Sequence, residues 1–274
     1  PIHRRRYMNE KSIRVNFLRP IGAATLGFLA TIGQLSIFMV NAVSHFVRPP
    51  IYFRLIGRQM IDVGYYSLPV VGLTTLFSGM VIALQSYTGA ARVTEDAALT
   101  QVSSVVVLAI TRELAPVLAG LMVAGRIGAA MAAEIGTMRV TEQIDALTTL
   151  STNPIKYLVV PRIIAGLTML PLLVLVGDVI GIFGGYIVGV YKLDFNAAIF
   201  IQKTYEFVTF FDVFSGLVKA AVFGFVVTLL GCYMGYYSSG GAQGVGAATT
   251  NAVVAAAILI LILDYLISQL FFGI

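Results

Sequence analysis

Two adjacent charged residues, Arg112 and Glu113, stand near the middle of an apolar run that extends from Val102 to Gly125. A charge at the centre of a bilayer costs at least about 2.5–3.5 kcal/mol on insertion scales, so such residues usually serve transport, binding or structural pairing. Neighbours in sequence point about 100° apart on a helix, so these two do not simply pair with each other. We expect each of them to need a further partner or water.

Pro116 follows Arg112 at the spacing of one helical hydrogen bond. Proline has no backbone N–H, so the carbonyl of Arg112 loses its usual partner. This predicts a kink beside the two charges and, together with them, a polar and partly hydrated cavity. A buried structural ion pair is the alternative.

Lys219 is the natural counterpart of Glu113, because it lies inside another apolar segment, DVFSGLVKAAVFG from 212 to 224. Its side chain either extends outward to the membrane surface or faces the same cavity as Glu113. Asp178 and Asp264 are the other acids within apolar runs. Both are expected to be structural, and Asp264 is expected to bond a backbone or hydroxyl group.

The composition places these residues in a membrane protein. The chain is 58% hydrophobic and 11% charged, whereas a soluble domain has about 25% charged residues, and its mean hydropathy is +0.90. The net charge of +5 comes largely from nine basic residues among the first 58. Basic residues that flank apolar segments mark the cytoplasmic side and its anionic lipids rather than nucleic acid, and a solvated basic tail is the plainer alternative.

Several classes of chemistry lack the residues that they need. Cys232 is the single cysteine and has no intrachain disulfide partner, and the two histidines, His3 and His45, form no cluster of metal-ligand type. No phosphate-binding loop or nucleophile–base pair is present. If this protein does driven work, the energy therefore comes from another subunit or from an ion gradient.

Five segments are long and apolar enough to cross the ~30 Å hydrocarbon core as helices. They are Gly64–Thr88, Gln101–Gly125, Ile163–Tyr191, Val213–Tyr237 and Ala247–Phe272. A further segment, Ile21–Val47, has basic residues on both sides and polar residues at intervals of seven. We expect it to lie in the cytoplasmic interface as an amphipathic helix, and a sixth span is the alternative. It is too long for the core of a signal peptide, so it is assigned to the mature protein.

Charge sets the expected orientation, with a cytoplasmic N-terminus. The turn with Arg92, Glu95 and Asp96 and the region Lys192–Asp212 have no basic excess and are placed outside, whereas the region Arg126–Arg162 is placed inside. The uncharged turn 236–244 falls inside by alternation. The predicted domains are a cytoplasmic tail with the interfacial helix, 1–62, and a transmembrane domain, 63–274.

Small residues recur at intervals of four in three of these segments, which favours close helix or protomer contacts. The stripes are Gly120, Ala124, Gly128, Ala132 and Gly136; Gly181, Gly185 and Gly189; and Gly231 and Gly235. For the last pair, the general abundance of glycine in membrane helices is an equal explanation.

The segment EIGTMRVTEQIDALTTLSTNP, 134–154, predicts a short helix that opens near Glu142 and ends at Asn153 and Pro154. Glu142 and Asp145 share one face of it, and Ile144 and Leu147 lie on another. Such a helix suits a groove on a cytoplasmic partner, and a solvated loop is the alternative.

The stretch TRELAPVLAGLMVAGRIGAAMAAEIGTMRVTEQIDAL, 111–147, resembles the MlaE/YrbE permeases, the membrane subunits of Mce-type lipid ABC transporters. The resemblance continues through PLL at 171–173, GGYIVGV at 184–190, LVKAAVFG around Lys219 and TTNAVV near 249. It covers roughly residues 58–272.

The resemblance implies a permease homodimer that moves phospholipids between inner and outer membranes in a bacterial inner membrane. Its expected partners are a cytoplasmic ABC ATPase, which holds the ATP and Mg²⁺, a STAS-domain protein and a periplasmic hexamer of Mce-domain proteins. This chain itself would have no catalytic residue, metal or cofactor. The fold expected is all-α, with five transmembrane helices, the interfacial helix and a coupling helix near 136–152.

The resemblance also suggests roles for individual residues. Substrate-binding residues are expected at Arg112, Glu113, Leu114, Lys219, Leu84 and Tyr87, with the leucines and the tyrosine against acyl chains. Coupling to the ATPase is expected at Arg139, Glu142, Gln143 and Asp145.

Two other functions remain open at this point. One is an ion-coupled secondary transporter that uses Glu113, Asp178 or Asp264 as proton sites. The absence of inverted halves counts against it. The other is a scaffold that only anchors a periplasmic lipid-binding ring.

Overall fold

The structure, a computed structural model, describes the backbone of residues 2–46, 48–50, 52–90 and 95–273, and the side chains of this set except 2–19, 21, 90 and 95–100. Arg92 and the side chains of Glu95 and Asp96, which entered the orientation argument, lie outside this set, as do the basic side chains up to Arg19. Every regular element in the described residues is helical. The prediction of an all-α membrane protein is confirmed.

The chain divides into two compact units, Pro1–Arg48 and Pro49–Ile274. The first unit contains one long helix, α1 (Ile2–Ser44). The division falls before α2 (Phe53–Val63), whereas the boundary predicted at residues 62 and 63 assigns α2 to the N-terminal part. α2 therefore belongs to the same compact unit as the transmembrane helices.

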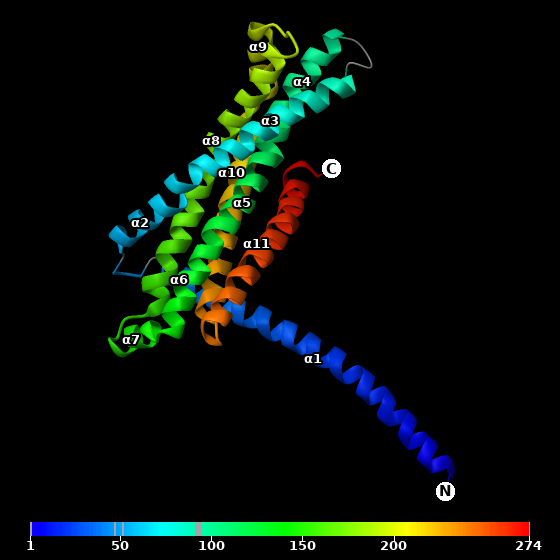
Figure 1. Cartoon of the computed structure of the whole chain (residues 1–274), viewed down its shortest axis with the longest axis vertical. Coiled ribbons are helices and arrows are strands. Elements are labelled where there is room, and N and C mark those ends of the chain that lie inside the picture. Colours follow the sequence, from blue (N-terminus) through cyan, green and yellow to red (C-terminus); the bar gives the residue numbers. More distant parts are fainter. Residues whose placement is uncertain (1, 47, 51, 91–94, 274) are drawn as a thin grey trace. The chain divides into compact units, whose positions relative to one another are not determined.

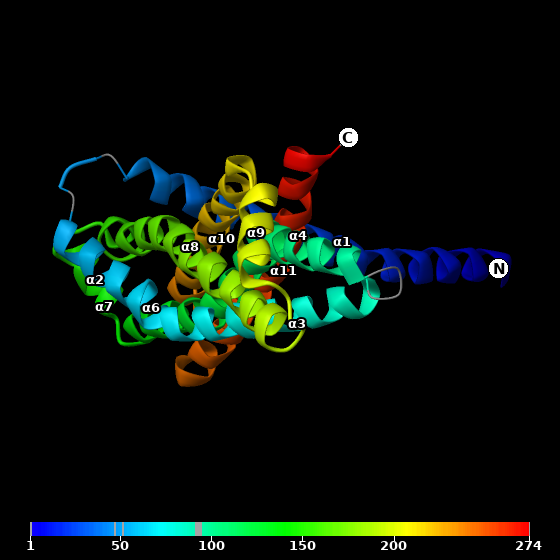
Figure 2. The same ribbon diagram turned by 90° about the horizontal axis from the view of Figure 1, so that it is seen from above.

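The second unit is a helical bundle (Figure 1). After α2 and the short turn η1 (Tyr65–Ser67), its helices are α3 (Leu68–Ala90), α4 (Glu95–Ala109), α5 (Ala115–Val123), α6 (Ala129–Val140), α7 (Gln143–Thr149), α8 (Val160–Tyr191), α9 (Ala197–Phe207), α10 (Phe210–Tyr236) and α11 (Gly241–Phe272). α8 packs between α3 and α10, and α10 also packs on α6 and α11. The short helices α7 and α9 lie at opposite ends of this bundle (Figures 1 and 2).

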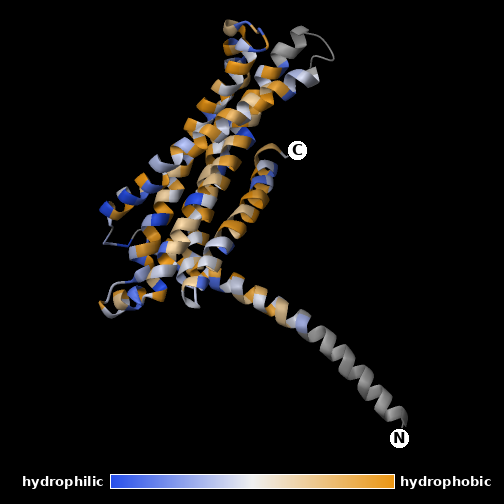
Figure 3. Cartoon of the chain, viewed as in Figure 1, coloured by the Kyte–Doolittle hydropathy of each residue, from blue (hydrophilic) through white to orange (hydrophobic). Residues whose placement is uncertain are grey.

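Hydropathy follows this arrangement. In the second unit, apolar residues dominate the long helices, and polar residues concentrate around α7 and α2 (Figure 3). Among the described residues, six helices are long and apolar enough to cross a membrane. Five of them correspond to the five predicted spans. The sixth, Gly22–Ser44, belongs to the segment that we assigned to the interface, so the count of six candidates differs from the five transmembrane helices predicted.

The helix that contains the second span is longer than predicted. It runs as one helical rod through α4, α5 and α6 and continues to Val140, whereas the predicted span ends at Gly125. Two wide π-helical turns interrupt the rod, η2 (Ile110–Leu114) and η3 (Ala124–Gly128), and a third, η4 (Ile155–Val159), precedes α8. π-turns inside helices occur frequently at functional sites, and η2 contains both Arg112 and Glu113.

The stripes of small residues lie between helices. A side-chain carbon added at Gly79 would overlap the backbone of Gly181, and one added at Gly231 would lie 2.9 Å from the carbonyl oxygen of Gly128. The closest helix packing in the bundle therefore depends on glycine backbones. The pair Gly231 and Gly235, for which chance was an equal explanation, lies in the contact of α10 with η3 and α6.

The turn between α10 and α11 has its own glycine requirement. Gly240 and Gly241 have φ angles of 93° and 69°, which side chains disfavour. α11 leaves this turn with only a narrow buried stripe, Ala248, Ala252, Ala256 and Ile260. Most of α11 is thus accessible within a single chain.

We predict that Gly79→Ala lowers the stability of the bundle, whereas Gly57→Ala in α2 does not. The new methyl group at position 79 meets backbone atoms of α8 that cannot rotate away, and overpacking of this kind costs about 1–3 kcal/mol. A methyl group at position 57 meets no atom within 4 Å. The midpoint of thermal unfolding of the detergent-solubilised protein measures the difference, and equal midpoints for the two variants would contradict the packing argument.

Candidate functional site

Lys219 is the centre of a charged cluster inside the bundle. Its ammonium nitrogen donates to Glu113 Oε2 at 2.7 Å and forms an ion pair with Asp264 Oδ1 at 2.9 Å. These three residues come from α10, η2 and α11. The Lys219 side chain is 0% exposed, so it does not extend to the membrane surface, and of the two orientations considered it adopts the one that faces Glu113.

The backbone distortion at Pro116 supplies a third partner for the same ammonium group. Lys219 Nζ donates to the backbone carbonyl of Arg112 at 2.9 Å. This is the carbonyl that Pro116 leaves without a helical N–H, as predicted. The irregularity takes the form of the π-turn η2, in which the Ala115 N–H reaches back to the carbonyl of Ile110.

Arg112 has a different partner from Glu113. Its Nε and Nη2 lie 2.7 Å and 2.6 Å from the same oxygen, Oδ1 of Asp212. The other carboxylate oxygen of Asp212 accepts from the backbone N–H of Thr209 at 2.9 Å and from its hydroxyl at 2.7 Å. The Arg112 guanidinium also lies 4.3 Å from the centre of the Phe272 ring. The expectation that Arg112 and Glu113 need separate partners is confirmed.

Asp212 is held in place by the start of its own helix. Thr209 and Asp212 form a capping box at the N-terminus of α10, in which each side chain accepts from the other residue's backbone N–H. The carboxylate is 1% exposed. Arg112 is therefore anchored to a fixed acid and does not rely on a mobile one.

The ion pairs Arg112–Asp212 and Lys219–Glu113 each have one buried member and one accessible member. Lys219 and Asp212 are 0% and 1% exposed, whereas the side chains of Glu113 and Arg112 are 43% and 35% exposed. Ser268 on α11 donates to Glu113 Oε1 at 3.0 Å. The accessible part of the cluster thus presents the Glu113 carboxylate and the Arg112 guanidinium to a ligand.

The residues present favour binding over bond-making chemistry. The cluster contains three carboxylates and two cations, held by one another, by hydroxyl groups and by a backbone carbonyl. Within the part of the chain that the structure describes, no group of three or more His, Cys, Asp or Glu is arranged to hold a metal ion. An accessible Arg–Glu pair inside an apolar bundle suits a ligand that has both a charged end and an apolar part.

The predicted apolar contacts lie in two places. Leu114 is half-buried in η2, beside the cluster. Leu84 and Tyr87 are half-buried on α3, and the Tyr87 ring packs edge-on against Phe195, with 5.8 Å between ring centres. Tyr87 therefore contacts the loop before α9, whereas Leu114 follows Glu113 of the charged cluster in η2.

Four residues of the cluster were missed as site residues, or given another role, from the sequence. Thr209 and Asp212 were assigned to an outer loop, Asp264 was expected to bond a backbone or hydroxyl group, and Ser268 was not considered. The spacing of Thr209 and Asp212, a threonine three residues before an acid at the start of an apolar run, is a helix-start signal that identifies a fixed carboxylate. Asp178 stays apart from these residues: it is 6% exposed, and its Oδ1 has no hydrogen-bond partner among the described residues.

The four residues expected to contact an ATPase lie in α7 or shortly before it in the sequence. Arg139 pairs with Asp145 at 2.7 Å, and Glu142 has a positive φ of 60° at the start of the helix. Gln143 and Asp145 are exposed, while Ile144 is 1% exposed and fixes the helix to the bundle. The short helix is confirmed, although it spans only Gln143–Thr149 rather than 136–152, and Asn153 caps the following turn.

An ion pair with one buried member connects α6 to α8. Arg162 on α8 donates to Glu134 Oε2 on α6 at 2.6 Å and to the carbonyl of Leu158 at 2.6 Å. These two side chains line a polar cavity of about 310 Å³ that α2 also borders.

Comparisons with known proteins identify the family of this chain. Residues 56–270 match the family described as Permease MlaE. The chain belongs to this permease family. A probable ABC transporter permease protein from Rickettsia bellii is 58% identical over 94% of this chain and 98% of that protein.

More distant relatives have more specific names. The intermembrane phospholipid transport system permease protein MlaE of Haemophilus influenzae is 33% identical over 94% of this chain and 98% of that protein. The chloroplastic protein TRIGALACTOSYLDIACYLGLYCEROL 1 of Arabidopsis thaliana is 36% identical over 85% of this chain and 65% of that protein. The present MlaE-family protein is a multi-pass membrane permease subunit of an ABC transporter, and ATP hydrolysis belongs to a separate subunit.

We predict that Asp212→Ala destabilises this permease, whereas Glu206→Ala does not. Removal of Asp212 leaves Arg112 and the N-terminus of α10 without a buried partner, at a cost of about 1–3 kcal/mol. Glu206 forms an ion pair with Lys203 on α9 whose side chains are 55% and 30% exposed, and such pairs contribute about 0–1 kcal/mol. Thermal unfolding of the purified variants measures both effects. An unchanged midpoint for Asp212→Ala would show that Arg112 does not depend on this anchor.

Proposed function

We propose that this permease moves phospholipids between the inner and outer membranes of a bacterium. The observation that carries the proposal is the accessible pair of Arg112 and Glu113 within an apolar span, each fixed by a buried partner. A phospholipid has a phosphate that matches a guanidinium, and many headgroups add an ammonium that matches a carboxylate. Its tails match the apolar helices around the cluster.

The similarity to the Haemophilus permease supports the same cargo. In this proposal Arg112, Glu113 and Lys219 form the headgroup end of the substrate site, and Leu114 contacts the acyl chains beside it. Leu84 and Tyr87 extend the apolar lining along α3. Asp212 and Asp264, whose ion pairs only the structure revealed, position Arg112 and Lys219 respectively.

A second copy of the chain is proposed to close the site through α11. Only 11% of the apolar window of α11 is buried in one chain, against 61% for α10. Its exposed residues include Ile258, Leu261 and Leu266. Since Asp264 and Ser268 of the cluster lie on the same helix, a copy packed on α11 would cover the open side of the charges.

The orientation and the remaining partners follow from the same proposal. The N-terminus and α7 face the cytoplasm of a bacterial inner membrane, where Arg139, Glu142, Gln143 and Asp145 contact the ABC ATPase. A STAS-domain protein and a periplasmic Mce-domain hexamer complete the complex. ATP and Mg²⁺ bind to the ATPase, and this chain needs no cofactor of its own.

We expect Glu113→Ala and Lys219→Ala to impair phospholipid transport without preventing assembly with the ATPase. Loss of one hydrogen bond to a charged group, worth about 1.5–3 kcal/mol, lowers transport by about tenfold or more. Transfer of a fluorescent phospholipid by the reconstituted complex gives the rate, and co-purification of the ATPase reports assembly. Glu206→Ala is the matched control. Normal transport by both cluster variants would defeat the proposal.

A separate prediction tests coupling at α7. Asp145→Ala and Glu142→Ala should reduce lipid-stimulated ATP hydrolysis by about fivefold, which corresponds to roughly 1 kcal/mol. Because both side chains are exposed, the fold of the permease should be unaffected. Lys203→Ala, at the α9 end, serves as the control. ATPase activity that is insensitive to both α7 changes would favour a scaffold that only anchors the periplasmic proteins.

A further inference from the structure

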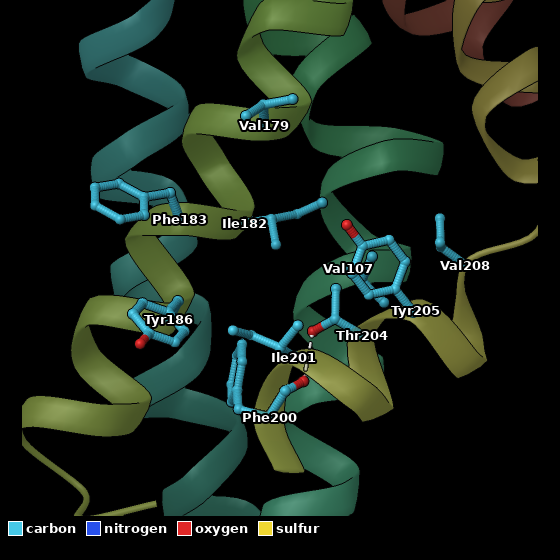
Figure 4. A pocket seen from close by; sticks show the side chains of 10 residues that line it. All are labelled: Val107, Val179, Ile182, Phe183, Tyr186, Phe200, Ile201, Thr204, Tyr205 and Val208. Atoms are coloured by element: carbon cyan, nitrogen blue, oxygen red, sulfur yellow. Dashed lines mark hydrogen bonds between the residues drawn. The ribbon is translucent and has the colours of Figure 1, made fainter. Parts of the chain in front are cut away.

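A second cavity lies at the α9 end of the bundle, apart from the charged cluster. Its volume is about 530 Å³, within the range of about 300–1,000 Å³ typical of small-molecule sites. Figure 4 shows its walls, with Val107 on α4, Ile182 and Phe183 on α8, and Ile201, Thr204 and Tyr205 on α9. None of the residues proposed for the headgroup site lines it.

The walls of this cavity are fixed by packing and by a helix cap. The Asn196 side chain accepts from the backbone N–H groups of Ala198 and Ile199, which starts α9. Phe200 is 1% exposed, and its ring packs edge-on against Tyr186 of α8, with 5.9 Å between ring centres. α9 also packs on α4. The cavity is therefore formed before any ligand arrives.

Water is a poor occupant of this space. The lining is almost entirely apolar, and the Thr204 hydroxyl is already bonded to the carbonyl of Phe200 at 2.9 Å. A buried water needs two to four polar partners, as a rough rule. Val179 and Phe183 line the cavity and are 70% and 54% exposed on a helix that is long and apolar enough to cross a membrane. Hydrocarbon is therefore the medium expected beside them.

We propose that this cavity binds one acyl chain of a phospholipid from the surrounding bilayer, at a site separate from the charged cluster. A transmembrane helix of another protein fits less well. The α8 residues that line the cavity, Val179 to Tyr186, extend over about 10 Å, a third of the ~30 Å that a spanning helix must cover. α9 also packs across the adjacent ends of α4 and α8. The site requires only the membrane location of the chain and is independent of what the permease transports.

The test uses the complete transporter complex in nanodiscs of phosphatidylcholine and phosphatidylglycerol. A small fraction of the phosphatidylcholine has a photoreactive diazirine at the end of one acyl chain. After illumination, mass spectrometry maps the lipid adducts. We expect adducts on the residues of α8 and α9 that line the cavity.

Ile182→Trp fills the cavity from α8 and should reduce these adducts by about tenfold, equivalent to ~1.4 kcal/mol. Val176→Trp is the control, since Val176 is exposed on α8 but does not line the cavity. If Ile182→Trp fails to assemble, Ile201→Trp fills the same space from α9. Absent adducts in the wild type, or equal adducts in the filled and control variants, would overturn the proposal. So would a photoreactive side chain at position 179 that attaches to a protein helix rather than to lipid.

A Lys219→Ala complex separates this inference from the proposed transport function. We expect it to lose transport while it keeps the adducts at the cavity. If the adducts disappear with Lys219→Ala, the two sites are not separate and the inference fails. If transport persists in Lys219→Ala and the adducts remain, the cavity stands and the transport proposal is weakened.

Discussion

The ammonium group of Lys219 is the contact on which the rest of the site depends. It is fully buried and meets two carboxylates and a backbone carbonyl, so it joins α10 to η2 and to α11 in one place. Without it, Glu113 and Asp264 would face each other with no cation between them, in a medium that scarcely screens charge. Lys219 also satisfies the carbonyl that Pro116 leaves free at the backbone distortion. The charged cluster and the helix irregularity thus share one donor group.

Close packing of the helix backbones lets Lys219 reach its partners on neighbouring helices. Gly79 meets Gly181, and Gly231 meets Gly128, at separations that leave no room for a side-chain carbon. Lipid tails are as apolar as the helix surfaces, so these contacts rather than hydrophobic burial hold membrane helices together. The polar cluster then adds directional interactions at one level of the bundle. The apolar cavity lined by α4, α8 and α9 is the contrasting feature, a space between helices that in our proposal holds an acyl chain.

Local chemistry explains which features could be predicted from the sequence. The spans, the separate partners of Arg112 and Glu113, and the freed carbonyl of Arg112 follow from helix length, helix geometry and the missing N–H of proline. The partners of Lys219 and Arg112 on distant helices could not be assigned so directly, because Asp212 and Asp264 lie at sequence distances that only the packing defines. Asp212 was nevertheless marked by its capping-box spacing with Thr209. The length of the second helix was misjudged because Arg126 was taken as the start of the cytoplasmic region. The helix instead continues to Val140, with Arg126 donating to the Ser67 hydroxyl and Glu134 accepting from Arg162.

The two ends of α11 are held by different means. At its start, Gly240 and Gly241 adopt backbone angles that only glycine takes easily, and near its end Asp264 and Ser268 are tied to Lys219 and Glu113. A ligand that competes for Glu113 must therefore also weaken the attachment of α11. By thermodynamic reciprocity, a partner that moves α11 away from the cluster changes the affinity of the cluster for that ligand. The factor is the same as that by which the ligand changes the affinity for the partner. Ligand binding at the charged cluster and the position of α11 are therefore linked equilibria. The groups that link them are the Ser268 hydroxyl, the carboxylates of Glu113 and Asp264, and the buried ammonium of Lys219.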